Sequence, residues 1–242
     1  MGSTIVASSV EEWLSFSVIA WTARIADGSP VGNIDASTTD QTPASLRRRI
    51  TPIGRTALAA AWSMVGLAEG PRIIFSSRHG EYARSYGLLQ SIAESGEVSP
   101  SEFSLSVHHA LVGLLSIATV NRAGHTAIAA GPESFGYGLL EAVASANDDG
   151  GPVLFVHFDA PLPDAYETVA AFFPEPAVVG LLITPSHRGA GEEMALAVGP
   201  AAGNGCAGGE SLAVHFVDFL NGRSPDGEAE GERLRWRWRR AA

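Results

Sequence analysis

The sequence contains no lysine, because all 16 of its basic residues are arginine. This absence excludes a Schiff-base lysine and the phosphate-binding lysine of a P-loop. A single cysteine, Cys206, excludes an intrachain disulfide and metal sites built from cysteine pairs. Since Cys206 lies in the glycine-rich segment "AAGNGCAGGES", it lacks the rigid support that a catalytic nucleophile needs.

The 26 acidic residues outnumber the 16 basic ones, and long apolar runs are missing. The formal net charge of −10 argues against nucleic acid as the main partner, because phosphate binding needs a basic surface. No apolar run approaches the roughly 18 residues that cross a bilayer. The opening "MGSTIVASSVEEWLSF" lacks the basic and apolar regions of a signal peptide. We therefore expect a cytoplasmic protein without a membrane span.

The 242 residues suffice for one large domain with a substantial core, and we find no internal repeat or domain boundary. We therefore predict a single domain over residues 1–242. Apolar runs and period-two alternation predict strands over 15–24, 71–77, 150–161, 176–186 and 192–200, and an Arg/Trp strand over 233–240. Helical patterns are predicted over 43–70 with a break at Thr51-Pro52, over 80–96, within 99–124, after 133 and over 210–220, followed by an acidic loop.

Strands that alternate with helices indicate an α/β fold. We predict a mostly parallel central sheet with antiparallel edge strands and helices on both faces.

One stretch, "TAIAAGPESFGYGLLEAV" (Thr126–Val143), has the pattern of a strand-to-helix elbow. Ser134 is a candidate nucleophile there, but "PESFG" departs from G-x-S-x-G at its first position, where Pro replaces Gly. A triad would also need one of His157, His187 and His215 and an acid such as Asp159, Asp164 or Asp218. A serine at this place is more typical of a helix cap. Glu133 is either a first-turn carboxylate favoured by the helix dipole or a functional group.

Three further clusters of polar residues have a structural and a functional interpretation. His108 and His109 are adjacent, so on a helix they point about 100° apart and do not share a metal ion; we expect no metal site. Arg78, His79 and Glu81 in "SSRHGE" follow a strand, where they form either loop structure or a ligand site. The arginines of the last strand form either a solvated face or a surface for an acidic macromolecule. They are Arg233, Arg235, Arg237 and Arg239.

The chain resembles the N-terminal half of β-ketoacyl synthases, which have the thiolase fold. It is most similar to the short chain-length-factor subunits of aryl-polyene and xanthomonadin-type pigment clusters. The match runs from about Arg47 to Ser186 and is strongest over "FSLSVHHALVGLLSIATVNRAGHTAIAAGPESFGYGLLEA". In ketosynthases the corresponding region reads R-G-P, a small-residue strand, and A-C-x-S-G at the elbow.

The resemblance implies that the nucleophile is missing. When Gly124 is set on the R-G-P glycine, Glu133 falls on the catalytic cysteine and Gly136 on the glycine of the motif; a shift of one residue places Ser134 there instead. Motifs similar to H-G-T-G-T and S-F-G-F-G-G-H, which supply the catalytic histidines, are also absent. We therefore expect no catalytic residue, no cofactor and no condensing activity of the chain alone.

The resemblance further implies a heterodimer with a β-ketoacyl-ACP synthase, in which this chain shapes the acyl tunnel. The implied tunnel and interface residues are Val107, His108, Leu111, Val112, Leu115, Phe135 and Gly136. An acyl carrier protein with its acyl chain is the second implied partner, and the arginines of the last strand are candidates for its docking surface.

Two enzymatic alternatives stay open at this stage. In the first, the chain is a small acyl hydrolase or transferase that uses Ser134 as nucleophile with His157 or His215 as base. In the second, Glu133 supports decarboxylation of a malonyl thioester.

Overall fold

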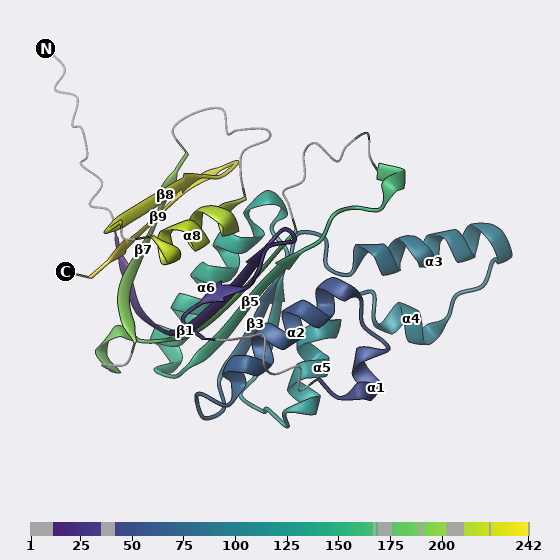
Figure 1. The fold of residues 1–242 in the computed structure, drawn as a ribbon, viewed down its shortest axis with the longest axis horizontal. Coiled ribbons are helices and arrows are strands. Elements are labelled where there is room, and N and C mark those ends of the chain that lie inside the picture. Colours follow the sequence, from purple (N-terminus) through teal and green to yellow (C-terminus); the bar gives the residue numbers. More distant parts are fainter. Residues whose placement is uncertain are drawn as a thin grey trace, which may run out of the picture.

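A nine-stranded mixed sheet forms the centre of the molecule in the computed structural model (Figure 1). The structure describes residues 12–34, 42–166, 168, 176–188, 191–201, 211–222 and 224–241, so Cys206 lies outside the described residues. The strands are β1 (Leu14–Ile25), β2 (Val31–Gly32), β3 (Arg72–Ser76), β4 (His125–Ile128), β5 (Val153–Asp159), β6 (Ala177–Thr184), β7 (Glu192–Pro200), β8 (Asp226–Glu230) and β9 (Leu234–Arg240). Their order is β4-β3-β5-β6-β1-β7-β9-β8, and β2 pairs with β1.

Helices cover both faces of this sheet. They are α1 (Ala44–Arg47), α2 (Pro52–Val65), α3 (Tyr82–Ser95), α4 (Pro100–Ser104), α5 (Ala110–Ala118), α6 (Ser134–Asp149) and α8 (Leu212–Asn221). Short 3-10 turns lie at Gly131–Glu133, Asp164–Tyr166 and Ser186–Arg188. α2 and α5 pack on one face, α6 and α8 on the other, and α3 and α4 project from one end (Figure 1).

The predicted mixed sheet with antiparallel edge strands is confirmed, but its antiparallel part is larger than we expected. Only the pairs that β3 makes with β4 and β5 are parallel among the described strands. These are the strands joined by crossovers that carry helices, as parallel pairing requires. The other pairs, from β5 with β6 to β9 with β8, are antiparallel.

The two helical layers create two cores, because successive side chains of a strand point to opposite faces. Along β5, Leu154, Val156 and Phe158 pack with α2 and α5, whereas Val153 and Phe155 pack with α6. Every residue of β5 and of β6 is buried. Burial on both faces explains why these two strands are continuous apolar runs rather than alternating ones.

Three predicted helix boundaries are confirmed by their caps. Thr51 precedes α2, and its hydroxyl accepts a hydrogen bond from Gly54 N at 3.2 Å, with Pro52 at the first helical position. Ser99 caps α4 in the same way. α3 ends at Gly96, whose φ of 72° is the left-handed conformation that favours glycine at this position.

Two local predictions were wrong. The helix predicted within 99–124 is divided into α4 and α5, so His108 and His109 lie in a turn before α5 rather than on a helix. The predicted acidic loop contains β8, in which Asp226, Glu228 and Glu230 are less buried than Ala229, which faces the core. A strand made mostly of acidic residues is stable at the edge of a sheet, because only one of its faces needs to be apolar.

Gly138 allows α6 to lie directly on the sheet. A Cβ atom at this position would lie 2.6 Å from the Phe155 ring and 2.7 Å from Ser76 Oγ. Gly113 of α5 differs, because a Cβ atom there would meet no heavy atom within 4 Å.

We expect Gly138→Ala to lower the free energy of unfolding by about 1–3 kcal/mol through overpacking. Gly113→Ala is the matched helical control and should leave that free energy unchanged or raise it by up to ~1 kcal/mol. Urea denaturation of both variants measures the difference. Equal stability of the two variants would contradict the close packing of α6 on β3 and β5.

Candidate functional site

The elbow predicted from the sequence follows β4, the strand at one edge of the sheet. The chain leaves β4 at Ile128, makes the 3-10 turn Gly131–Glu133 and enters α6 at Ser134. Gly131 has a φ of 60°, so the turn uses the left-handed conformation that glycine adopts without strain. The strand-to-helix elbow is therefore present, and Glu133 is the last residue before α6.

The Glu133 side chain points into the protein and binds the start of β9. Its Oε1 accepts hydrogen bonds from Leu234 N at 3.0 Å, Trp236 Nε1 at 3.3 Å and Arg233 N at 3.5 Å. Only 2% of Glu133 is exposed. A Cβ atom at Gly231 would lie 2.8 Å from Glu133 Cδ, so this approach requires glycine there. The carboxylate thus joins the elbow to the last strand and has no free face for a substrate.

Ser134 bonds only to the turn that precedes it, as far as the described residues show. Its hydroxyl donates to Gly131 O at 2.7 Å and accepts from Ala130 N at 2.9 Å. This is the structural role typical of a serine at a helix start. The proposed pairing of Ser134 with His157 as its base is wrong, because the ring nitrogens of His157 contact other residues.

A serine, a histidine and an aspartate do form a hydrogen-bonded chain elsewhere in the fold. His157 Nδ1 lies 2.9 Å from Ser76 Oγ, and His157 Nε2 lies 3.3 Å from Asp159 Oδ2. Sequence analysis missed Ser76, the first residue of "SSRHGE", because a serine at the end of a buried strand gives no signal of its partners. Ser76 is sealed beneath Gly138 of α6, so no substrate reaches its hydroxyl. The chain of groups is a buried polar network and not a nucleophile with its base.

Asp159 anchors this network to the loop after β3. Its Oδ1 accepts hydrogen bonds from Arg78 N at 2.8 Å and Ser77 Oγ at 3.1 Å. Burial alone would raise the pKa of Asp159, but the charge of His157 and these hydrogen bonds outweigh it and hold the pKa below the ordinary 3.8.

Some residues of "SSRHGE" support the local structure, and some line a pocket. Glu81 is buried and accepts a hydrogen bond from Thr51 Oγ1 at 2.6 Å, so it supports the cap of α2. Burial lowers the pKa of His79, and the neighbouring Arg78 guanidinium lowers it further. A pocket of about 470 Å³ is lined by His79, Glu81 and Tyr82.

The region expected to line a tunnel exposes only part of the set predicted for it. Leu111, Val112 and Leu115 are buried in this chain's own core, so they do not form a surface toward a partner. The α5 region exposes Val107, which belongs to the predicted set, together with Ile117 and Val120, with exposed fractions of 45%, 77% and 72%. Leu111, Val112 and Leu115 do share one face of the helix, and α5 turns this face toward the sheet.

Two other predicted interface residues are also internal. Phe135 packs in the core beneath α6 and α8. A Cβ atom at Gly136 would lie 2.5 Å from the Trp236 ring, so this glycine serves the packing of β9. Neither residue is exposed at the surface of the chain.

The two adjacent histidines each approach another histidine. The His108 ring lies over Gly80, close to His79, and the His109 ring lies 4.7 Å from that of His125. Burial and the neighbouring His109 ring lower the pKa of His125. Among the described residues, no three histidine, cysteine or acidic side chains are grouped so as to hold a metal ion.

The arginines of β9 face acidic residues. In the β8–β9 register, Arg235, Arg237 and Arg239 stand opposite Glu230, Glu228 and Asp226. The Arg239 guanidinium also lies 4.0 Å from the centre of the Trp13 ring. This face is therefore charge-compensated within the chain, and Trp236 and Trp238 are buried on the other face.

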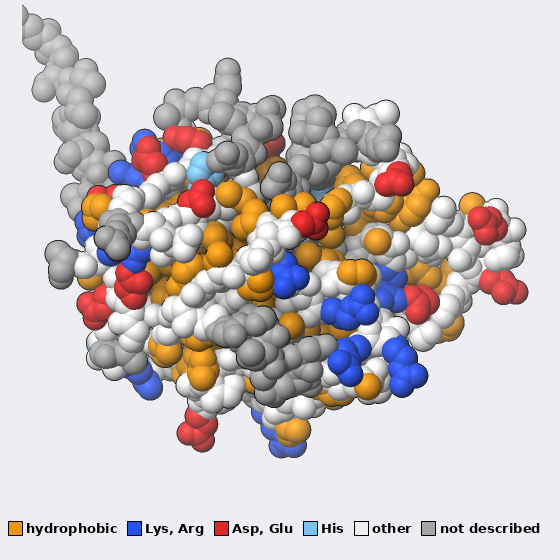
Figure 2. Space-filling model, in the orientation of Figure 1, with side chains coloured by type: hydrophobic (Ala, Val, Ile, Leu, Met, Phe, Trp, Pro, Cys, Tyr) orange, Lys and Arg blue, Asp and Glu red, His pale blue; other side chains and the backbone are white. Residues whose placement is uncertain are grey.

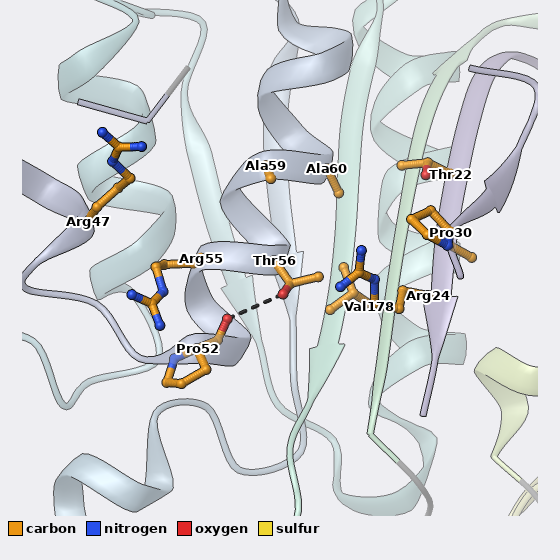
Figure 3. Close-up of a pocket in the computed structure, with 11 residues that line it drawn as sticks. Thr22, Arg24, Pro30, Arg47, Pro52, Arg55, Thr56, Ala59, Ala60 and Val178 are labelled. Atoms are coloured by element: carbon orange, nitrogen blue, oxygen red, sulfur yellow. Dashed lines mark hydrogen bonds between the residues drawn. The ribbon is translucent and has the colours of Figure 1, made fainter. Parts of the chain in front are cut away.

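A group of arginines without such compensation lies around α1 and α2. In Figure 2 the blue side chains gather on the side of the molecule where these helices lie. Arg24, Arg48, Arg49 and Arg55 are exposed, and none forms an ion pair within the described part of the chain. A pocket of about 650 Å³ lies between α2 and β1 and is lined by Arg24, Arg47 and Arg55 (Figure 3).

The sequence matches the model of the β-ketoacyl synthase N-terminal domain over residues 20–239. The chain belongs to this family. The resemblance that the sequence analysis drew from the elbow is thereby confirmed. No curated protein sequence matches the chain.

Solved ketosynthase structures share the fold. The chain is similar to one in the complex of the ketosynthase ApeO with its chain length factor ApeC from Xenorhabdus doucetiae, with 27% identity and a TM-score of 0.78, over 94% of this chain and 100% of that one. It is similar to a chain of the ishigamide ketosynthase/chain length factor, with 11% identity and a TM-score of 0.61, over 78% and 68% of the two chains. It is also similar to a chain of AntDE:AntF, a type II PKS acyl-carrier protein in complex with its ketosynthase, with 12% identity and a TM-score of 0.61, over 78% and 70% of the two chains.

Among the described residues of this β-ketoacyl synthase domain, no helix has both the length and the apolar character needed to span a bilayer.

We expect Glu133→Ala to destabilise the domain, because it leaves buried donors at Leu234 and Trp236 without an acceptor at a cost of about 1–3 kcal/mol each. Glu133→Gln retains an acceptor oxygen and should cost less. Urea denaturation measures the loss, and amide exchange at Leu234 locates it. Equal stability of the Ala and Gln variants, with unchanged exchange at Leu234, would show that Glu133 does not hold β9.

The depressed pKa of Asp159 predicts a pH dependence. The folded state binds fewer protons than the unfolded state, so the stabilisation is present above the ordinary pKa of 3.8 and is lost as the pH falls through the folded pKa. We expect Asp159→Asn to lower stability at neutral pH and to flatten the acid limb of the stability curve. Denaturation at several pH values tests this, with Asp226→Asn as an exposed control. A variant with the wild-type acid limb would refute the assignment.

Proposed function

We propose that the chain is a non-condensing partner of a ketosynthase in polyketide chain elongation, of the chain-length-factor type. The observation that carries the proposal is the buried Glu133, which occupies the elbow where the resemblance places the catalytic cysteine of a ketosynthase. A carboxylate that accepts three N–H groups neither forms a thioester nor contacts a malonyl group. The 27% identity to a chain of nearly equal length in a ketosynthase/chain length factor complex supports this role.

The partner ketosynthase, in our proposal, docks at the β4 edge and completes a heterodimer. The residues of β4, His125–Ile128, include no Lys, Arg, Asp or Glu, and they are all half-buried. The opposite edge, β8, carries three acidic residues, which disfavour pairing with another strand. β4 is therefore the better suited of the two edges for pairing with a second chain.

The α5 region provides the apolar surface beside this edge. α5 packs against β4, and it exposes Ile117 and Val120. Val120 has a φ of 53°, a conformation that a β-branched residue rarely adopts. Two large apolar side chains exposed beside an open strand edge are typical of a surface that is covered in the assembly.

We further propose that this exposed α5 surface, and not the buried residues named from the sequence, forms this chain's part of the acyl tunnel wall. The bulk of Val107 and Ile117 then limits how long the product grows, since forcing a few more methylenes against a packed wall costs about 1–3 kcal/mol. In our proposal the product is an aryl polyene or a fatty-acid-like chain, and an acyl carrier protein carries it; the resemblance to pigment-cluster subunits supports both points.

We expect co-expression with a partner ketosynthase to give a stable complex, and Ile117→Glu to weaken it at least tenfold by burying a charge at the interface. Leu67→Glu is the matched control, because Leu67 is also an exposed apolar residue but follows α2, which packs mainly on β5 and β6. Co-purification and native mass analysis measure the complex, and product analysis reports chain length.

Three results would contradict the proposal. One is an isolated chain that is monodisperse and binds no ketosynthase. The second is labelling of the isolated chain by a serine-directed phosphonate that Ser134→Ala abolishes, which would favour the hydrolase alternative. The third is carbon dioxide release from a malonyl thioester that Glu133→Gln abolishes without loss of the complex, which would favour the decarboxylase alternative.

A further inference from the structure

The segment between β3 and α5 forms an arm that projects from one end of the molecule (Figure 1). We define the arm as residues 82–104, which comprise α3, α4 and the residues between them. No residue of α3 or α4 is buried, and α3 packs mainly on α4. Apolar side chains of the arm are exposed, among them Leu89, Ile92 and Phe103. The placement of the arm therefore depends on the contacts at its base.

The chain enters and leaves the arm beside two histidines, His79 and His108. A Cβ atom at Gly80 would lie 3.3 Å from the His108 ring, and the φ of Gly80 is 59°, so both the ring and the backbone favour glycine there. The His79 imidazole is close enough to that of His108 for their charges to interact. His79, Gly80 and His108 thus bring the two ends of the arm together, and we call this contact the clasp.

Charged and titratable groups surround the clasp. The Arg78 guanidinium and the Asp159 carboxylate at the end of β5 act on His79 in opposite directions. Tyr82 of α3 contacts His79 from the side of the arm, with 5.9 Å between the ring centres. The other charged groups of the pocket beside His79 are Arg24, Asp27 and Glu81.

The surroundings of the clasp are unfavourable for an imidazolium. The Nε2 atom of each histidine is buried, and that of His108 makes no hydrogen bond within the described part of the chain. A proton on His79 would place a second cation beside Arg78, and a proton on His108 would bury a charged N–H without an acceptor. Burial, Arg78 and His108 lower the pKa of His79, and together they outweigh Asp159, which raises it.

The other contacts that hold the arm keep their charge in mild acid. Arg84 of α3 pairs with Glu102 of α4 and donates a hydrogen bond to Arg49 O at 2.5 Å. Tyr82 Oη bonds to Tyr166 Oη at 2.9 Å, and this bond raises the pKa of Tyr82, so its phenol stays neutral. Imidazole is the group whose ordinary pKa lies between about pH 5.5 and 7.5. A change at the base of the arm in this range therefore reports on the clasp.

We propose that the clasp is a proton-sensitive switch, which holds the base of the arm closed at neutral pH and opens it in mild acid. Opening separates the turn before α5 from the loop after β3 and brings both imidazoles into water. The closed state binds fewer protons than the open state, so closure is favoured above the ordinary pKa of 6.5 and weakens as the pH falls below it. Acidification thus changes the placement of the apolar side chains on the arm.

Hydrogen exchange of the full chain, followed by mass analysis of peptides, tests the switch at neutral pH and in mild acid. The rates are corrected for the intrinsic pH dependence of amide exchange. The informative amides are those of Gly80, which bonds to Ser77 Oγ at 2.6 Å, and Ala110, which bonds to Val107 O at 3.0 Å. They lie on the two sides of the clasp. A peptide from β5, which is buried throughout, is the internal reference.

Two variants act on the clasp in different ways. His79→Phe/His108→Phe keeps two flat rings at the base of the arm but removes both titrating groups. Gly80→Ala places a Cβ atom against the His108 ring in a backbone conformation that strains alanine. The matched control is His109→Phe/His125→Phe, because these two rings contact each other, 4.7 Å apart, outside the clasp. Circular dichroism checks that each variant is folded.

We expect the corrected exchange at Gly80 and Ala110 of the wild-type chain to rise about tenfold from neutral pH to about pH 5.5. This is the factor for one histidine that is neutral in the closed state and has its ordinary pKa in the open state. The clasp variant should show a rise of less than about twofold, and the control should rise as the wild type does. Gly80→Ala should exchange faster than the wild type already at neutral pH.

The switch is ruled out by any of three results. The first is a wild-type chain whose corrected exchange at the clasp is the same at both pH values. The second is a clasp variant that keeps the wild-type rise. The third is an equal rise in the β5 peptide, which would indicate a general loss of stability instead of an opening at the arm. All three are measured on the chain without a ketosynthase, so they are independent of the proposed function.

Discussion

The hydrogen bonds from the start of β9 to the Glu133 carboxylate connect the two parts of the chain that define this protein. One part is the elbow after β4, and the other is the C-terminal strand, some hundred residues later in the sequence. The bonds fix Trp236, whose ring in turn packs on Gly136 in the first turn of α6. A side chain turned inward to hold a strand is withdrawn from the surface where a ketosynthase would perform chemistry. The same interaction thus joins the elbow to β9 and keeps the Glu133 carboxylate away from the surface.

Polar side chains at the end of β3 also have a structural role. Ser76, His157 and Asp159 have the residue types of a hydrolytic triad, yet α6 covers them and Gly138 lets it do so closely. Buried polar groups of this kind are tolerated because each has a partner, and they fix the relation of neighbouring strands. Residue types alone therefore do not identify an active site; access decides.

Most of the architecture was predictable from the sequence, because apolar runs and caps act locally. β5 and β6, the break at Thr51-Pro52 and the end of α3 at Gly96 follow from such signals. The site was less predictable. The helical period places Leu115 and Ile117 on different faces of α5, but both residues are apolar, so the pattern does not show which face meets the core. Glu133 is 101 residues from Leu234, and His157 is 81 residues from Ser76. One sequence carries no record of such contacts.

The unequal edges of the sheet bear on how large an assembly can become. A sheet with two receptive edges would add chains without end and form fibres. Here one end of the strand order is uncharged and the other, β8, repels a further strand with its row of carboxylates. If a partner pairs with β4, the free edge that this chain still presents is β8, so the sheet of this chain does not accept a second partner at its edge. The acidic strand β8 therefore opposes edge-to-edge association of further protein chains.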